Sequence, residues 1–276
     1  MRKSSPTAAA SMLGFAIVMS PFADLQATEL KVLAGGSMTG SLNELGPQFE
    51  RASGHKLTIH FDSTPNLIKQ ATSGEPFDLA VVPVDVFKDP TAKARFVPGP
   101  TIDIARVGYG VIVRAGAPKP DVSTPDALKQ TLLNAQSITF LPESAAGAYV
   151  LSVFSRLGIS EAMKAKTKPQ AAPAQIAHAV AKGEADLGVF LVNVLIAPGV
   201  ELAGPFPAEL QQELVFTSAV AADSKNAEAA RAFINYLMTP TAAAVIKARY
   251  DPRLRRPRTS RQDDYFQTAV SDNEAR

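Results

Sequence analysis

The chain has 276 residues, of which 46% are hydrophobic and 20% are charged, and its formal net charge is only +2. This composition is typical of globular proteins, so it excludes a wholly disordered chain, a fibrous repeat and a strongly basic nucleic-acid binder. Because the sequence has no cysteine, disulfides, zinc–thiolate sites, iron–sulfur clusters and cysteine nucleophiles are also excluded.

The N-terminal segment has the pattern of a secretory signal peptide. Basic residues at positions 2 and 3 precede an apolar run over 8–18, and the small residue Ala27 ends the segment. The apolar run is too short to span a bilayer, which needs ~20 residues, so a membrane-anchoring helix is the weaker alternative. We therefore predict a signal peptide over 1–27 and a periplasmic mature protein, with cleavage near Ala27 or, alternatively, at Ala23.

Strand and helix signals alternate at the start of the mature chain. The pattern predicts strands over 30–34, 56–61 and 77–82, with helices running to Phe49 and from Thr64 to Gly74 between them. Gly46 and Pro47 lie inside the first helical pattern and are expected to weaken or kink that helix. The β-α-β-α-β order predicts a parallel sheet that is covered by helices.

The alternation continues to about residue 250. The later predicted elements are strands over 105–113, 137–141, 187–191 and 214–222, and helices beginning at 125, 145, 173, 227 and 240. The helix–Gly-Glu–strand unit that starts at Pro65 is echoed by one that starts at Pro173, which suggests two lobes of similar build. Residues 251–276 are rich in arginine and poor in apolar residues, so we expect a basic, flexible tail.

Most catalytic motifs are missing from the sequence. There is no Walker A pattern, and Gly108-Tyr109-Gly110 lacks the third glycine of a dinucleotide fingerprint. The stretch around Ser37 is not a nucleophile elbow, because a threonine stands where G-x-S-x-G needs glycine. No two of the three histidines have metal-ligand spacing on one element. We therefore expect no catalytic role, no metal and no cofactor.

Two loops place a hydroxyl residue at the start of a helix after a buried strand. Ser37 follows Gly35-Gly36, and Thr64 follows Asp62-Ser63. A helix N-terminus has free N–H groups and a partial positive charge, so such loops suit a bound anion. The alternative is that both residues are simply helix N-caps, which need no ligand.

The stretch from Leu30 to Pro83 resembles the opening of the molybdate-binding family of periplasmic substrate-binding proteins. The matching residues are Ser37, Thr64, Leu67, Gln70, Gly74 and Asp78. Pro142 to Tyr149 is similar to a second turn of that family, and the looser similarity covers 30–250.

The resemblance implies a type 2 periplasmic binding fold. Its two Rossmann-like α/β lobes, over 28–106 plus 215–250 and over 107–214, would be joined by two crossing strands near 105–109 and 214–217 and would close over a ligand. The family holds an oxyanion by hydroxyls and backbone N–H groups. On this sequence the resemblance assigns that role to Ser37, Thr64 and Ala146.

Two positions depart from the family pattern. One backbone donor falls on or beside Pro173, which has no N–H, and the family's tyrosine ligand falls near Leu191. A dehydrated dianion needs nearly all of its hydrogen bonds, so Ala174, Tyr149 or Asn193 would have to compensate, or the ligand is a different anion. Tyr149 and Asn193 are therefore weaker candidate ligands, with core packing and loop capping as their alternatives.

The sequence as a whole predicts an exported solute-binding protein of an ABC-type uptake system. We expect a monomer that binds a molybdate-like oxyanion or small organic acid and delivers it to a membrane permease, with no nucleic-acid partner. A sensing or adaptor domain and, less favoured, an enzyme on the same fold are the alternatives.

Overall fold

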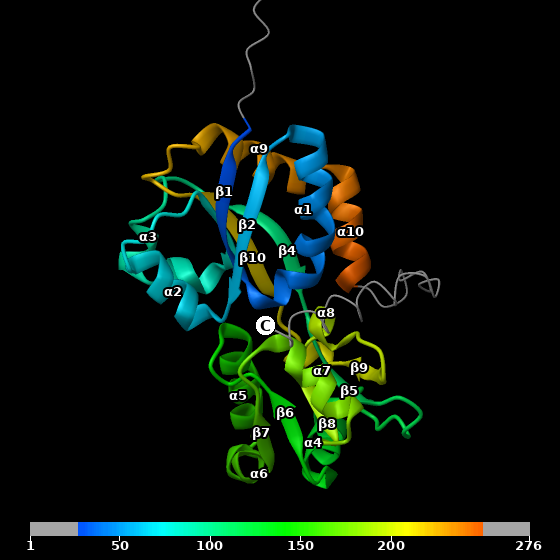
Figure 1. Ribbon diagram of the computed structural model, residues 1–276. Helices are drawn as coiled ribbons and strands as arrows, with labels where there is room; N and C mark the ends of the chain where they lie inside the picture. The colour runs from blue at the N-terminus through cyan, green and yellow to red at the C-terminus, as the bar shows by residue number, and fades with distance from the viewer. Residues whose placement is uncertain (1–26, 251–276) are drawn as a thin grey trace, which may run out of the picture.

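Two mixed five-stranded sheets organise the protein. The structure is a computed structural model that describes residues 27–250, and the predicted signal peptide (apart from Ala27) and basic tail lie outside these residues. Figure 1 shows the two sheets in two lobes, one above the other, with helices packed around each sheet. This architecture confirms the predicted two-lobe α/β fold.

The first sheet has the strand order β2-β1-β3-β10-β4. Its strands are β1 (Glu29–Gly35), β2 (Lys56–Asp62), β3 (Leu79–Pro83), β4 (Ile102–Val107) and β10 (Leu214–Val220). Strands β1, β2 and β3 are parallel, whereas β10 runs antiparallel to both of its neighbours. The helices of this lobe are α1 (Thr39–Ser53), α2 (Thr64–Thr72), α3 (Pro90–Lys93), α9 (Ala227–Leu237) and α10 (Pro240–Tyr250), with 3₁₀ turns η1 (Gly36–Met38) and η2 (Val84–Lys88).

The second sheet repeats this plan with the order β7-β6-β8-β5-β9. Its strands are β5 (Tyr109–Arg114), β6 (Ile138–Phe140), β7 (Thr167–Pro169), β8 (Leu187–Leu191) and β9 (Val200–Pro205). Strands β7, β6 and β8 are parallel, whereas β5 runs antiparallel to both of its neighbours, β8 and β9. The helices are α4 (Pro125–Asn134), α5 (Ala145–Arg156), α6 (Ser160–Lys166), α7 (Pro173–Ala181) and α8 (Val192–Leu195), with the 3₁₀ turn η3 (Ala208–Leu210).

The two units that echo each other in the sequence occupy equivalent places. Helix α2 leads into β3 in the first sheet, and α7 leads into β8 in the second. Both strands are buried along their whole length, which explains their uninterrupted apolar sequences. The internal echo therefore reflects a repeated fold.

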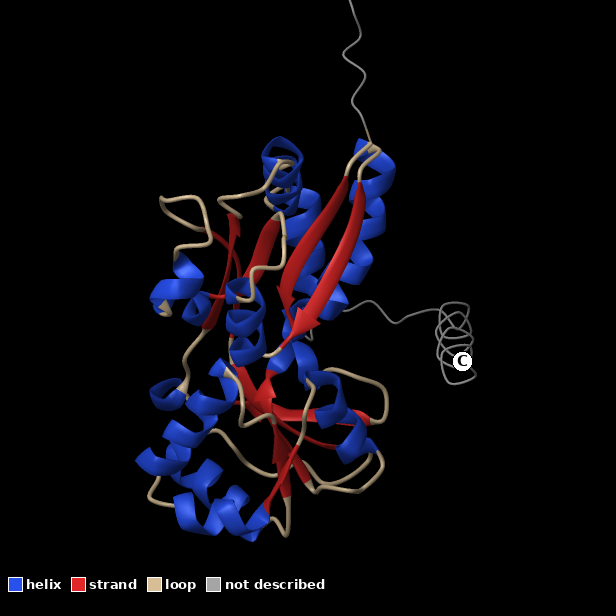
Figure 2. Ribbon diagram, turned by 60° about the vertical axis from the view of Figure 1, so that its left-hand side comes forward, coloured by secondary structure: helices blue, strands red, loops and turns tan. Residues whose placement is uncertain are grey.

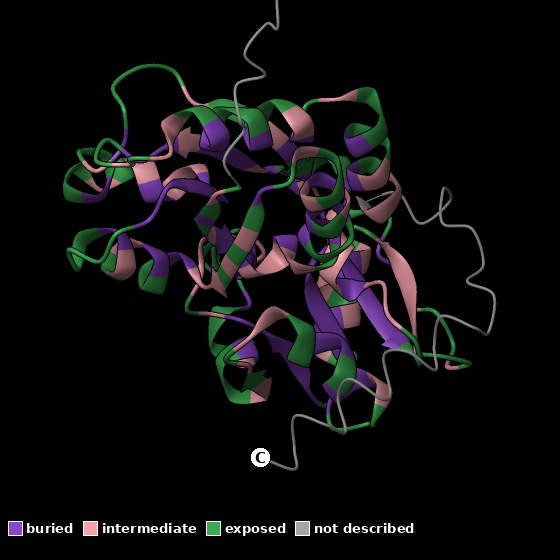
Figure 3. Ribbon diagram, turned by 45° about the horizontal axis from the view of Figure 1, so that its top comes forward, coloured by how far each residue is buried: buried purple, intermediate pink, exposed green. Residues whose placement is uncertain are grey.

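Alternation along the strands divides the first lobe's interior in two. Leu30, Val32 and Ala34 pack in one apolar cluster with α1 and α9, whereas Leu33 faces a second cluster with α2. Figure 2 shows helices around the strands of each lobe, and in Figure 3 buried residues gather in the central strands while most exposed residues lie on helices and loops.

Helix α1 differs from its prediction. It continues through Pro47 from Thr39 to Ser53 without interruption. The residue before a proline normally clashes through its Cβ in a helix, but the residue before Pro47 is Gly46, which has no Cβ. The glycine thus allows the proline to be accommodated, and no break is needed.

The strand predicted over 105–113 is divided between the lobes. Strand β4 ends at Val107 in the first sheet, and β5 begins at Tyr109 in the second, so the chain crosses at Gly108. It returns between Pro205 and Leu214. Among the described residues, no helix combines the length and apolar character needed to cross a membrane.

Candidate functional site

A small cavity lies between the lobes at the carboxyl ends of β1, β2, β3 and β8. Its walls comprise Gly35, Gly36, Ser37, Asp62, Ser63, Thr64, Pro83, Leu141, Ser144, Ala146, Pro173, Phe190, Leu214 and Phe216. Its volume of about 20 Å³ is that of a site for roughly one water molecule. A larger ligand does not fit unless the cavity walls move apart.

Ser37 and Thr64 both line this cavity, but neither is an N-cap. Ser37 lies inside the turn η1, and Thr64 is the first residue of α2, with Ser63 in the capping position. Thr64 is only 8% exposed, and its Oγ1 accepts a hydrogen bond of 3.3 Å from the backbone N–H of Ala145 in the other lobe. The alternative that both residues are simply helix N-caps is therefore wrong.

Helices from both lobes begin at the cavity. The turn η1, α2, α5 and α7 each contribute residues of their first turn to its walls. At the start of α5, Ser144 Oγ caps the N–H of Gly147, whereas the N–H of Ala146 has no acceptor among the described residues. Several partial positive charges thus converge where the walls have no cationic side chain, which suits a small anion.

The two positions that depart from the molybdate-binding pattern make part of the cavity apolar. Pro173 begins α7 and lines the cavity without an N–H to offer. Leu191 is fully buried at the end of β8, and its neighbour Phe190 lines the cavity. Phe216 completes this wall from β10. The sequence offered no signal for the two phenylalanines, because they look like ordinary core residues of buried strands.

The two weaker candidates, Tyr149 and Asn193, lie outside the cavity lining. Tyr149 donates its hydroxyl to the carbonyl of Leu210 at 2.7 Å, and its ring packs on Tyr109 at the crossing between lobes. Burial raises the pKa of Tyr109 well above its usual range. Asn193 Nδ2 donates to the carbonyl of Ser37 at 2.6 Å, so Asn193 joins the lobes.

Asp62, which the sequence interpretation did not select, is the only ionisable residue among the described residues that line the cavity. Its Oδ1 accepts from the N–H of Ser63 at 2.7 Å and from Asn66 Nδ2 at 2.8 Å. Its Oδ2 accepts from Gln70 Nε2 at 3.1 Å and lies 3.5 Å from His60 Nε2. Burial raises the pKa of Asp62, but the hydrogen bonds from Asn66, Ser63 and His60 outweigh it and lower the pKa overall.

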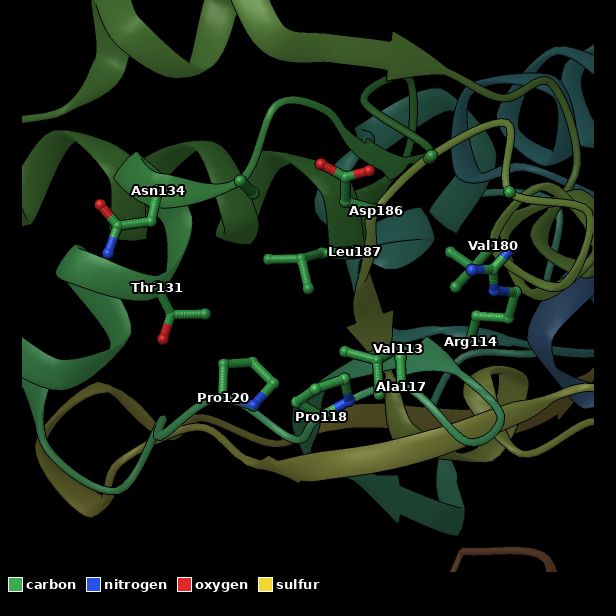
Figure 4. A pocket seen from close by; sticks show the side chains of 13 residues that line it. Val113, Arg114, Ala117, Pro118, Pro120, Thr131, Asn134, Val180, Asp186 and Leu187 are labelled. Carbon is green, nitrogen blue, oxygen red and sulfur yellow. The ribbon is translucent and has the colours of Figure 1, made fainter.

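Larger hollows lie away from this site. One of about 420 Å³ in the second lobe is shown in Figure 4, with Pro118 and Pro120 on one side and Asp186 and Leu187 on the other. Another of about 990 Å³ lies beside the crossing at Gly108 and α10. Neither contains a predicted site residue. Within residues 27–250, no three histidine, aspartate or glutamate side chains gather in a way that could hold a metal ion.

Comparison with known proteins identifies the family and two relatives of this chain. Residues 30–249 match the family described as bacterial extracellular solute-binding protein. The chain is 33% identical to an aconitate isomerase from a Pseudomonas species, over 80% of this chain and 86% of that protein. It is 29% identical to the molybdate-binding protein ModA of Azotobacter vinelandii, over 81% and 89% of the two chains.

A solved structure of a molybdate-binding protein shares the fold. The periplasmic molybdate-binding protein of Azotobacter vinelandii superimposes with a TM-score of 0.67 at 22% identity. The match covers 80% of this chain and 97% of that one.

The aconitate isomerase relative corrects one prediction. The sequence has no known catalytic motif and no evident acid–base pair, and it therefore predicts no catalytic role. A relative of this similarity is nevertheless an enzyme. A search for motifs along the chain cannot recognise a residue, such as Asp62, whose place in the wall of a cavity depends on the tertiary fold. The chain belongs to the bacterial extracellular solute-binding proteins of the molybdate-binding type, a family whose members include at least one enzyme.

Proposed function

We propose that this protein binds a small organic polycarboxylate between its lobes and isomerises it, as an exported protein from which residues 1–27 have been removed. The observation that supports this proposal best is the mixed lining of the cavity. Ser37, Thr64 and the N–H of Ala146 supply donors, whereas Pro173, Phe190 and Phe216 add apolar surface to the same walls. A tetrahedral oxyanion presents oxygen in every direction and leaves such walls unmatched, while an organic acid presents C–H groups to them.

The charge of Asp62 also favours an organic acid. A negative side chain beside a compact dianion opposes binding, and no cationic side chain among the described lining residues offsets it. In an organic acid the carboxylates are separated by carbon atoms. One carboxylate can therefore lie at the helix N-termini while the carbon chain lies between it and Asp62.

The proposed reaction is the shift of a double bond in an unsaturated tricarboxylate of the aconitate type. This activity is taken from the relative that is named aconitate isomerase. In aconitate, moving one proton between the two carbons that flank the central carbon restores the same skeleton, so the shift interconverts the cis and trans forms. The reaction needs no oxidant and no second substrate.

The second candidate is capture of molybdate or a similar oxyanion for an ABC permease, with the protein acting as a monomer. It is favoured by relatives named molybdate-binding proteins from three bacteria. The helix N-termini at the cavity suit any small anion. The two candidate functions therefore differ in which anion the apolar walls and Asp62 favour.

A thermal-shift panel separates them. The chain from Thr28 to Arg276 is mixed with cis-aconitate, trans-aconitate, citrate, tricarballylate, molybdate, tungstate and sulfate. A ligand at 100 times its Kd stabilises by about 2.7 kcal/mol, which raises Tm by roughly 5–11 °C for a protein of this size. We expect this shift with the tricarboxylates. A shift with molybdate or tungstate alone would establish the second candidate, and the absence of any shift would contradict both.

Removing the Thr64 hydroxyl tests whether the cavity is the binding site. Thr64→Val keeps the shape of the side chain but removes the group that bonds Ala145 across the lobes, so the Kd of the best ligand is expected to rise about tenfold. Thr72→Val on the same helix is the matched control, because its hydroxyl bonds only to backbone carbonyls within α2. Equal affinities of the two variants, measured by titration calorimetry, would place the ligand elsewhere.

A further inference from the structure

The carboxylate of Asp62 is held in place from several directions. Asn66 and Gln70 both belong to α2 and lie one helical turn apart, and each donates to a different oxygen of Asp62. Gln70 Nε2 is also 2.7 Å from His60 Nε2. Asp62 itself ends β2, two residues before Thr64, and its side chain is 25% exposed. Asp62 is also one of the residues that line the cavity, so these bonds give a residue beside the ligand a fixed orientation.

From this geometry we infer that Asp62 is the catalytic base that moves the proton, an inference that rests on the proposed isomerase function. One Asp62 oxygen removes a proton from the CH₂ carbon of the bound tricarboxylate, and the electron pair of that C–H bond becomes an allylic carbanion. The negative charge is shared by the two terminal carbons and by the carboxylates that they carry. Asp62 then returns the same proton to the other terminal carbon, and the double bond moves by one position.

Backbone donors elsewhere in the cavity can stabilise the negative charge that forms during this reaction. The N-termini of α2 and α5 meet at the bond between Thr64 and Ala145, so charge that develops on a carboxylate there faces backbone donors. Gln70 and His60 are positioning residues, because they contact the carboxylate of Asp62 and do not line the cavity. No other described residue of the cavity wall can accept the proton at neutral pH.

The test is the replacement of Asp62 by its neutral isostere. Asp62→Asn is expected to fold, because the introduced amide keeps an acceptor for Ser63 and Asn66. Gln70 can then rotate its buried Oε1, which has no partner among the described residues, toward the new amide. Turnover of trans-aconitate, followed by proton NMR in D₂O as isomerisation and deuterium uptake, is expected to fall at least about a hundredfold. Binding is expected to tighten by about threefold to tenfold, because a negative charge beside an anion has been removed.

Asp121→Asn is the matched control. Asp121 is an exposed second-lobe carboxylate whose pKa is also lowered by hydrogen bonds from Ser123, and it lies outside the cavity lining. We expect it to turn over and bind like the wild type. Turnover by Asp62→Asn at the wild-type rate would overturn the inference and leave the proposed function standing. A parallel loss of binding and turnover would also overturn it, because that is the signature of a structural residue.

The pH profile gives a second, independent check. His60 is the titratable group that contacts Asp62 on β2, and the residues of α2 that contact it, Asn66 and Gln70, are neutral amides. A base must be ionised, so kcat at saturating substrate is expected to persist as the pH falls and to be lost only below the ordinary aspartate value of 3.8. Loss of kcat already near neutral pH would overturn Asp62 as the base. A wild-type protein that binds tricarboxylates without exchanging any proton would refute the isomerase function itself.

Discussion

Replacing Gly147 by alanine is expected to lower the free energy of unfolding by about 3 kcal/mol or more and to abolish ligand binding. A Cβ at this position would lie only 1.9 Å from the carbonyl oxygen of Leu141 and 2.6 Å from that of Pro142. Both contacts are with backbone, so neither can be relieved by rotating a side chain. The loop over 141–144 would have to move away from the first turn of α5.

That movement would also damage the site. The hydroxyl of Ser144 bonds both to the carbonyl of Leu141 and to the N–H of Gly147, and this cap holds the start of α5 in place. The same turn presents the N–H groups of Ala145 and Ala146 to the cavity. A displaced loop therefore removes the second lobe's donors together with the cap.

Thermal unfolding and ligand titration measure both effects. A loss of 3 kcal/mol corresponds to a fall in Tm of roughly 6–12 °C for a protein of this size. Gly40→Ala is the matched control: an added Cβ there would lie 3.1 Å from Nη1 of Arg249, which is the far end of a flexible side chain and can shift. Its stability is expected within about 1 kcal/mol of the wild type. If the two variants are equally stable, the packing described for Gly147 is wrong.

Replacing Asp78 by alanine is expected to destabilise the first lobe by about 3–5 kcal/mol. Asp78 is buried, and its Oδ2 accepts from the N–H of Lys31 at 2.8 Å. Its Oδ1 accepts from Ser224 Oγ at 2.7 Å and from Asn226 Nδ2 at 3.1 Å. One carboxylate thus connects β1 and β3 with the turn that leads into α9, and its removal leaves three donors unsatisfied.

Urea unfolding of three variants tests this role. Asp78→Asn keeps the side-chain shape but introduces an N–H group among donors. We expect it to lower the free energy of unfolding measurably, but by less than Asp78→Ala does. Asp126→Ala removes an exposed carboxylate from the first turn of α4 and is expected to cost less than about 1 kcal/mol. A loss for Asp78→Ala as small as that of Asp126→Ala would show that the network contributes little.

Much of the architecture was readable from local sequence. Thr124 and Pro125 predicted the start of α4, and Thr124 does cap it by accepting the N–H of Ala127. The buried runs of β3 and β8 were equally clear. The edge strands β7 and β9 were not predicted, because a strand with one partner and mostly exposed or half-buried side chains needs neither an apolar run nor a regular alternation.

The candidate site was readable only in part. Ser37, Thr64 and Ala146 follow strands that end at the cleft, so the α/β pattern together with the resemblance selected them, and the fold brings them to one cavity. Tyr149 lies outside the cavity lining, and its hydroxyl bonds to the carbonyl of Leu210. Phe190, Phe216 and Asp62 come from three strands in two sheets, and nothing local distinguishes them.

The sequence by itself determined the buried strands, the long helices, the cap of α4 and the hydroxyls that follow β1 and β2, because these depend on neighbouring residues and on apolar periodicity. Only the tertiary structure decided that residues 105–113 belong to two sheets, that Asp62 lies at the wall of a ligand cavity and that Thr64 bonds across the lobes. Strand pairing joins residues as far apart in the chain as Leu79 and Val220, and the cavity wall joins Gly35 and Phe216. The energies of these contacts depend on which surfaces meet, and no short stretch of sequence contains that information.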